Sequence, residues 1–338
     1  MQSWQTDLLN LQLSLVLKPL MRHVGSVDRI RQIVGISDCL IGPLAIPRGT
    51  QREKISMPGG EFEAAWISTP YSRKDKVIFY LPGGAYILRT PNTHEAMVSR
   101  LCRTAGMSAL VAYYRLAPEH PFPACLDDAV LAYQWLLDEG YQPRNIVIAG
   151  DSAGGGLALS TLLTLKERKL PLPACAFMMS PLLDVSDHAP SRWKNAQHDT
   201  ALPAPYKRAV NPRPMYLGNN DADNPIVSPI NGNLEGLPPM YITVSDSEML
   251  LDDSLRLARR GHTYNVDVKV DVWRKVPHVW PVFGFLPEAG KTMERAARFF
   301  ARHVTGVGAD AVAQRRYNKP TLVQRLRGKH QSATARER

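Results

Sequence analysis

Residues 145–155 read Asn-Ile-Val-Ile-Ala-Gly-Asp-Ser-Ala-Gly-Gly, a short apolar run followed by a serine between glycines. A helical pattern starts directly after it, so the stretch predicts a strand, a sharp turn and a helix. Such a turn exposes a serine hydroxyl, here that of Ser152, above the edge of a sheet. Side chains at positions 150 and 154 would clash there, and the helix adds the positive end of its dipole. The motif predicts Ser152 as a nucleophile, against the alternative of a glycine-rich turn that only starts a helix.

From about residue 62 the chain alternates apolar, β-rich runs with helical patterns. The expected strands span residues 62–68, 77–81, 109–114, 145–149, 174–179, 240–244 and 266–273. The expected helices span residues 94–104, 126–138, 154–168, 250–260 and 291–303. This alternation predicts an α/β fold with a mostly parallel central sheet and helices on both faces. Ligands bind such sheets at the carboxyl ends of the strands.

A serine nucleophile needs a base within hydrogen-bonding reach and an acid that orients the base. When a serine sits on such a turn in this kind of sheet, the acid and then the histidine follow it along the chain. His278 lies in a loop just after the last expected strand, whereas the other histidines beyond residue 240 lie at a helix end, inside a helix or in the tail. The acid should follow the strand at 240–244, and spacing leaves Asp246 and Glu248 both open.

The transition state of acyl transfer develops an oxyanion that backbone amides must stabilise. Pro82-Gly83-Gly84-Ala85 directly follows an expected strand, and its small residues let amides approach a substrate oxygen. We therefore expect the oxyanion hole among Gly83, Gly84 and Ala85, together with the amide of Ala153 after the nucleophile.

Composition and charge limit the class of protein. Of the 338 residues, 44% are apolar and 21% are charged, which is ordinary for a soluble globular protein with a large core. The net charge of +10 is concentrated at one end, because residues 311–338 hold eight Lys or Arg against one Glu, a net +7. Since the remainder is close to neutral, we expect no nucleic-acid partner. A tail that contacts a membrane surface or a nucleic acid is the weaker alternative to a solvated tail.

The four cysteines, Cys39, Cys102, Cys125 and Cys175, are widely separated and form no C-x-x-C pair. Their spacing favours buried free thiols over a metal site or a disulfide framework. No window approaches the roughly 18 apolar residues of a spanning helix. The N-terminal apolar stretch also lacks the preceding basic residue of a signal peptide. We expect a cytoplasmic protein with no metal and no stable membrane insertion.

Two segments fall outside the alternation. Residues 1–48 contain leucines at helical spacing that also alternate as in a strand, and we favour helix. Residues 184–224 are rich in Pro, Asn and Asp, and an insertion of that length is usually a lid or binding loop. The expected division is an N-terminal segment at 1–48, a catalytic domain at 49–305 and a basic tail at 306–338.

Beyond these patterns, the chain resembles the bacterial hormone-sensitive-lipase-like carboxylesterases of the α/β-hydrolase superfamily over about residues 60–303. The most specific part is residues 114–124, Tyr-Arg-Leu-Ala-Pro-Glu-His-Pro-Phe-Pro-Ala. Residues 150–155, Gly-Asp-Ser-Ala-Gly-Gly, match the family's nucleophile elbow. Ser228-Pro229, followed by Gly-Leu-Pro-Pro at 236–239, matches the approach to its acid strand.

The resemblance implies a serine esterase that acts on short- to medium-chain acyl esters without a cofactor. Ser152 and His278 fall on the family's nucleophile and base, and the acid aligns best with Glu248, with Asp246 as the runner-up. One departure is Pro82, where the family usually has a histidine before the glycines. The geometry of the oxyanion loop is therefore open.

By the same resemblance, a cap built from residues 1–48 and the insertion at 184–224 covers the acyl pocket, with Tyr86 and Trp193 in its wall, and a homodimer is expected. The residues fit a lactone hydrolase or a small-molecule deacetylase equally, because the cap builds most of the substrate pockets. A non-catalytic ligand-binding protein on this fold is a remote alternative.

Overall fold

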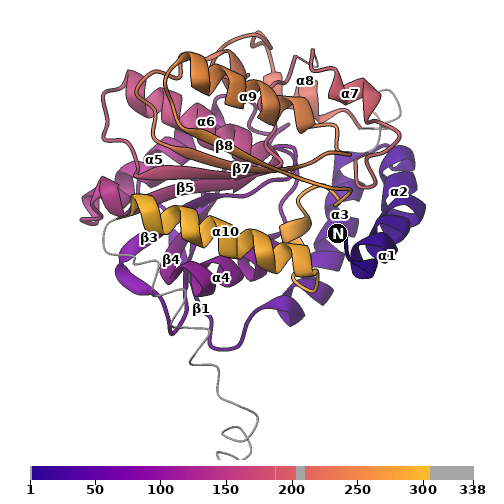
Figure 1. Cartoon of the computed structure of the whole chain (residues 1–338), viewed down its shortest axis with the longest axis horizontal. Helices are drawn as coiled ribbons and strands as arrows, with labels where there is room; N and C mark the ends of the chain where they lie inside the picture. The colour runs from indigo at the N-terminus through magenta and orange to yellow at the C-terminus, as the bar shows by residue number, and fades with distance from the viewer. Residues whose placement is uncertain (1, 187, 203–209, 305–338) are drawn as a thin grey trace, which may run out of the picture.

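The computed structural model describes residues 2–186, 188–202 and 210–304, and it contains one central sheet (Figure 1). In the described residues the sheet has eight strands in the order β1-β2-β4-β3-β5-β6-β7-β8. The strands are β1 Gln51–Ser56, β2 Glu63–Ser68, β3 Arg73–Leu81, β4 Met107–Tyr113, β5 Ile146–Asp151, β6 Cys175–Met179, β7 Met240–Ser245 and β8 Val268–Trp273. The pairs β1–β2 and β2–β4 are antiparallel. Every later pair in this order is parallel, which confirms the mostly parallel sheet.

Helices cover both faces of this sheet (Figure 1). One face carries α4 Pro91–Ala105 and α10 Pro287–His303, and the other carries α5 Ala124–Asp138, α6 Ser152–Glu167 and α9 Leu251–Thr263. Strand β3 shows why two cores form, because its successive side chains point to opposite faces. Phe79 packs in the core with α5 and α6, while Tyr80 packs in the core with α4 and α10. The α/β-hydrolase architecture predicted from the sequence is therefore confirmed.

One strand was not predicted. Strand β1 lies at the antiparallel edge, and most of its side chains are exposed and polar or charged. A strand with one neighbour and both faces exposed to solvent has no alternation of apolar and polar residues, so its sequence lacks the pattern that predicts a strand.

The N-terminal segment is helical, as favoured. It consists of α1 Trp4–Gln12, a π-helical stretch at Leu13–Leu17, α2 Lys18–His23, α3 Val27–Ile41 and a 3₁₀ turn at Gly42–Ala45. Leu9 and Leu13 pack with Trp280 and Leu286, close to the start of α10. Ser3 caps α1 and donates to the Glu288 carboxylate. The segment therefore rests on the same end of the molecule that carries the loop after β8.

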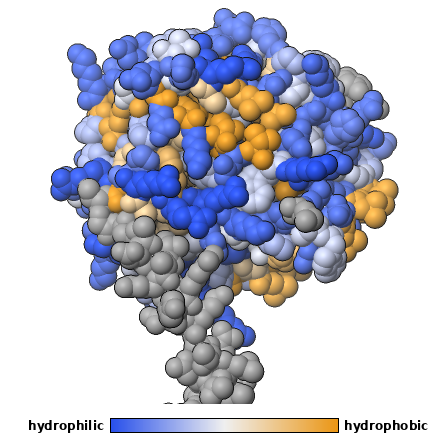
Figure 2. All heavy atoms as spheres, in the orientation of Figure 1, coloured by the Kyte–Doolittle hydropathy of each residue, from blue (hydrophilic) through white to orange (hydrophobic). Residues whose placement is uncertain are grey.

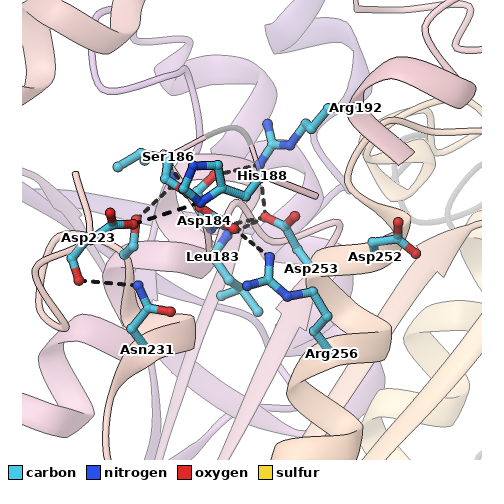
Figure 3. Close-up of polar contacts among 12 residues, drawn as sticks. Leu183, Asp184, Ser186, His188, Arg192, Asp223, Asn231, Asp252, Asp253 and Arg256 are labelled. Carbon is cyan, nitrogen blue, oxygen red and sulfur yellow. Dashed lines mark hydrogen bonds and ion pairs between the residues drawn. The ribbon is translucent and has the colours of Figure 1, made fainter. Parts of the chain in front are cut away.

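The insertion at 184–224 contains two short helices among its described residues, α7 Ser191–Lys194 and α8 Pro212–Leu217. A buried polar network joins its start to α9 (Figure 3). One oxygen of Asp253 accepts from the Leu183 and Asp184 amides and from Arg192, while Arg256 pairs with Asp184. Burial raises the pKa of Asp253 to about 6 against the opposing charge of Arg192. These contacts fix the insertion beside the carboxyl ends of the strands.

In the described residues, no helix is both long and apolar enough to cross a bilayer. The predicted basic tail at 306–338 lies outside the described residues.

Candidate active site

Ser152 lies at the turn between β5 and α6, at the carboxyl end of a central parallel strand. Its φ is +51°, a strained value for a residue with a side chain. The neighbouring glycines are required by close packing: a Cβ on Gly154 would lie 2.0 Å from the Leu81 carbonyl oxygen, and one on Gly150 would lie 2.4 Å from the Gly154 carbonyl oxygen. The tight turn holds the Ser152 side chain above the sheet.

His278 is positioned by the loop after β8 and lies between a serine and a carboxylate. Its Nε2 is 2.9 Å from Ser152 Oγ, and its Nδ1 is 2.6 Å from Glu248 Oε2. Asp246, the runner-up acid in the sequence, accepts instead from the Lys275 amide at 2.7 Å. The fold thus brings together Ser152, His278 and Glu248, which are far apart in the chain.

The side chain of Glu248 is 1% exposed, and both of its oxygens have partners. Its Oε1 accepts from the Ser245 amide at 2.6 Å and from Ser180 Oγ at 2.9 Å. Burial by itself lowers the pKa of His278, but the hydrogen bond to Glu248 and its negative charge raise it, and the net pKa lies above the ordinary value. The carboxylate is thereby fixed in orientation and favours the protonated imidazole.

Ser180 is a residue of this site that the sequence did not reveal. It follows β6, its hydroxyl donates to Glu248, and the same oxygen accepts from the Val279 amide at 3.3 Å. It therefore ties the acid to the loop that carries the histidine. The available signal was position alone, since β6 lies between β5, which leads to Ser152, and β7, which leads to Glu248.

The glycine loop after β3 lies on the other side of Ser152. The Gly83 amide donates to Asp151 Oδ1 at 3.0 Å, so among the four predicted oxyanion donors this amide already has an acceptor. Within the described residues the amides of Gly84 and Ala85 have no protein acceptor, and the loop turns there through φ values of +128° and +53°. Of the predicted donors, the amides of Gly84 and Ala85 and the Ala153 amide at the start of α6 remain candidates for an oxyanion hole.

Asp151 supports this loop. The loop begins with Pro82, in the place where the family usually has a histidine. Besides the Gly83 amide, the Asp151 carboxylate accepts from Tyr80 Oη at 2.6 Å and lies 3.3 Å from His94 Nε2. Burial opposes ionisation of Asp151, but His94, Tyr80 and the Gly83 amide together lower its pKa below the ordinary value. The loop is therefore held by an ionised carboxylate under its backbone.

A pocket of about 140 Å³ opens beside Ser152. Tyr86 lines it and stacks on Tyr216 with ring centroids 3.8 Å apart. Trp193, the other predicted wall residue, is 53% exposed and does not line the pocket, whereas its neighbour Arg192 does. Trp193 and Arg192 lie on the short helix α7, and the ion pair with Asp253 holds Arg192 inward.

Comparisons with known proteins agree with this geometry. A family model described as alpha/beta hydrolase fold matches residues 78–282. The acetyl-hydrolase of Streptomyces hygroscopicus is 36% identical over 285 residues, covering 84% of this chain and 92% of that protein. The carboxylesterase/phospholipase LipF of Mycobacterium tuberculosis is 30% identical over 90% of this chain and 83% of its own length. A crystal structure of an esterase from the bacterial hormone-sensitive lipase family has a TM-score of 0.82 at 34% identity, covering 90% of this chain and 99% of that one.

The fold, the site and these relatives define a carboxylic ester hydrolase. Within that class, the chain belongs to the alpha/beta hydrolase family, in the group of bacterial hormone-sensitive-lipase-like esterases. The family and the class of enzyme predicted from the sequence are therefore confirmed.

Proposed function

We propose that Ser152, His278 and Glu248 are the nucleophile, the base and the orienting acid of a serine carboxylesterase. The observation that carries the proposal is the unbroken chain of contacts from Ser152 Oγ through the His278 ring to Glu248. An acid hydrogen-bonded to Nδ1 leaves Nε2 free to accept the serine proton, which is the arrangement that activates a serine.

In the proposed reaction, Ser152 Oγ attacks the ester carbonyl carbon while His278 Nε2 takes its proton. The negative carbonyl oxygen of the tetrahedral intermediate is stabilised by the amides of Gly84, Ala85 and Ala153. The intermediate collapses when the C–O bond to the alcohol breaks and His278 returns the proton to that alcohol. A water molecule, deprotonated by His278, then attacks the acyl carbon of the acyl-enzyme. The bond from that carbon to Ser152 Oγ breaks, His278 returns the proton to Ser152 Oγ, and the acid leaves. No cofactor or metal takes part in these steps.

The size of the pocket supports a small acyl group. Its volume of about 140 Å³ is below the range of roughly 300–1,000 Å³ of typical ligand pockets. The stacked rings of Tyr86 and Tyr216 form part of its wall. We infer a preference for acetyl to butyryl esters over longer chains. The printed name of the Streptomyces relative, acetyl-hydrolase, favours removal of acetyl groups from a small molecule as the second candidate.

The division of the chain and its compartment belong to the same proposal. The N-terminal segment at 1–48 and the insertion at 184–224 form the cap, and the insertion belongs to a catalytic domain at 49–305 that a basic tail follows at 306–338. The contact that supports a joint cap is Lys18 of α2, which donates to the carbonyls of Ala196 and Asp199 in the insertion. Three of the cysteines are buried free thiols, a usage that supports a reducing cytoplasm.

Turnover of p-nitrophenyl esters tests the function. We expect hydrolysis of the acetate and butyrate, slower hydrolysis of the octanoate, and loss of all three activities in Ser152→Ala. A fluorophosphonate should label the wild type at one serine and leave the variant unlabelled. Undiminished turnover in Ser152→Ala would remove the nucleophile assignment, and octanoate as the best substrate would remove the inferred chain length.

A further inference from the structure

The N-terminal helices expose an unusual amount of apolar surface. Among the described residues, fourteen large hydrophobic side chains are exposed, and ten of them lie between residues 4 and 44. We call these ten the apolar face: Trp4, Leu8, Leu11, Leu15, Val16, Ile33, Ile36, Leu40, Ile41 and Leu44. Figure 2 shows hydrophobic side chains at the right-hand edge of the molecule, where Figure 1 places α1 and α2. Monomers rarely leave so many large apolar side chains together in water without a function for them.

The first helical run, from α1 through α2, carries an apolar stripe on its outer side. Trp4, Leu8, Leu11 and Leu15 recur at i, i+4, i+7 and i+11, and each is 49–70% exposed. The opposite side of the same run is also apolar, because Leu9 and Leu13 are buried in the core beside α10. The inner side holds this run on the domain. The outer stripe is therefore available for a second contact.

Helix α3 and the turn after it repeat the pattern. Ile33, Ile36, Leu40 and Leu44 recur at i, i+3, i+7 and i+11 and are 37–86% exposed. On the inner side, the buried carboxylate of Asp38 accepts from the backbone amides of residues 92 and 93 at the start of α4. The helix is thus docked by one side, and its other side presents a second apolar stripe.

A cavity of about 610 Å³ opens on this face. Its walls are almost entirely apolar and come from the two helical runs and the loop after β8. They are Leu17, Leu20, Val24, Ile30, Ile33, Val34, Ile41, Ala45, Val282, Phe283 and Phe285, with Ser37, Asp38, Thr90, Thr93 and Arg100 and two glycines. Ile33 and Ile41 belong both to the apolar face and to the cavity wall, so the cavity opens there. Ile30 lines both this cavity and the pocket beside Ser152, so the two lie on either side of one side chain.

We propose that the apolar face adsorbs on the surface of a lipid aggregate, with hydrocarbon chains filling the cavity that opens on it. Flexible hydrocarbon can fill such a cavity, whereas a second copy of this chain would need a matching apolar protrusion. Outside the apolar face, the exposed large hydrophobics of the described residues are Phe285, which lines the cavity, and Tyr71, Trp193 and Val272. The charge also fits a phospholipid surface. Residues 1–48 carry five Lys or Arg against three Asp, and since Lys18 and Asp38 are buried, four basic side chains remain against two acidic ones. Amphipathic helices lie in a lipid interface in this way, with the apolar side at the acyl boundary.

Sedimentation with phosphatidylcholine vesicles tests the proposal. We expect the wild type to partition onto the vesicles and the double variant Leu15→Gln/Leu40→Gln to partition about tenfold more weakly, because two exposed leucines are lost from the contact. Neither leucine lines the cavity or the catalytic pocket. Turnover of dissolved p-nitrophenyl acetate should therefore stay unchanged, which also reports that the variant is folded. Val272→Gln, which removes an exposed hydrophobic side chain from β8, is the matched control and should bind as the wild type does.

Trp4 gives an independent readout because it is 70% exposed on the apolar face. Vesicles of brominated phosphatidylcholine should quench the fluorescence of the wild type more than that of Trp4→Phe. Ser152→Ala should bind vesicles normally, so adsorption is tested apart from catalysis. The proposal is overturned if the wild type does not sediment, or if the double variant sediments equally well. It is also overturned if the wild type is a dimer in solution that the double variant dissociates and vesicles leave intact.

Discussion

The catalytic centre and the apolar face of the N-terminal helices are built in opposite ways. The carboxylate of Glu248 is 1% exposed and has partners for both oxygens, whereas Leu15 is 67% exposed on a helix held mainly by its other side. The centre gains its geometry from short, directional hydrogen bonds in a dry environment, where a misplaced group is costly. The apolar face gains only proximity to hydrocarbon, which has no preferred direction. We therefore expect single substitutions to have large effects in the centre and small, cumulative effects on the N-terminal helices.

The largest effect should follow from removing the charge of Glu248, the proposed orienting acid. Glu248→Gln should lower kcat by about 10³- to 10⁴-fold, because an amide can hold the wrong tautomer of His278 and does not stabilise the imidazolium. Asp246→Asn is the matched control, since Asp246 accepts from the Lys275 amide and does not contact the ring. Steady-state kinetics on p-nitrophenyl acetate measures both. A larger loss in Asp246→Asn would mean that the acid is misassigned.

The pH dependence of activity should report on the same pair of residues, His278 and Glu248. Activity needs the neutral imidazole, so kcat/KM should fall as the pH drops through the pKa of His278. Because Glu248 raises that pKa, the acid limb should lie above the ordinary value of about 6.5. In Glu248→Gln the acid limb of the residual activity should shift to a lower pH, since the neutral amide no longer favours protonation of His278. A pH profile of kcat/KM for both proteins decides this, and an unmoved limb would contradict the coupling.

A smaller loss should come from the brace under the oxyanion loop. Asp151→Ala leaves the Gly83 amide and the Tyr80 hydroxyl without their buried acceptor. We expect kcat to fall by about 10- to 100-fold, which is no more than the fall caused by removing one oxyanion donor. KM should change little, because the pocket wall is not touched. Asp151→Asn keeps an acceptor for Gly83 and should recover most of the rate. Equal losses in both variants would show that the role is not the support of that amide.

The smallest effect should lie in the N-terminal helices. Ser3→Ala removes the cap of α1 and its hydrogen bond to Glu288. The free energy of unfolding should therefore fall by about 1 kcal/mol, with turnover unchanged. Ser37→Ala is a matched control, because its hydroxyl is exposed and donates only within its own helix. Calorimetry and p-nitrophenyl acetate turnover give the two readouts. A loss of activity in Ser3→Ala would show that this end of the cap is coupled to catalysis.

Much of the frame could be predicted because its signals are local. The fully buried strands such as β5 read as apolar runs, and the glycines around Ser152 are required by backbone contacts within a few residues. His278 could be selected because it follows the last strand and the other late histidines have ordinary positions. Their catalytic roles stay predictions until the variants are measured. Strand β1 escaped prediction because exposed residues at a sheet edge carry no periodic signal.

Three features could be predicted from the sequence: the order of elements from β2 onward, the turn that carries Ser152, and the short set of residues from which an acid and a base could come. Three contacts became visible only in the folded molecule. Glu248 and not Asp246 contacts His278, the Gly83 amide donates to Asp151, and Ser180 donates to Glu248. The tertiary structure also decided which leucines of the N-terminal helices face inward, because leucines on both sides of a helix look the same in a sequence. The physical reason is common to all of these. Each depends on the direction in which a group points from its own element, and that direction acquires meaning only when distant elements pack against it.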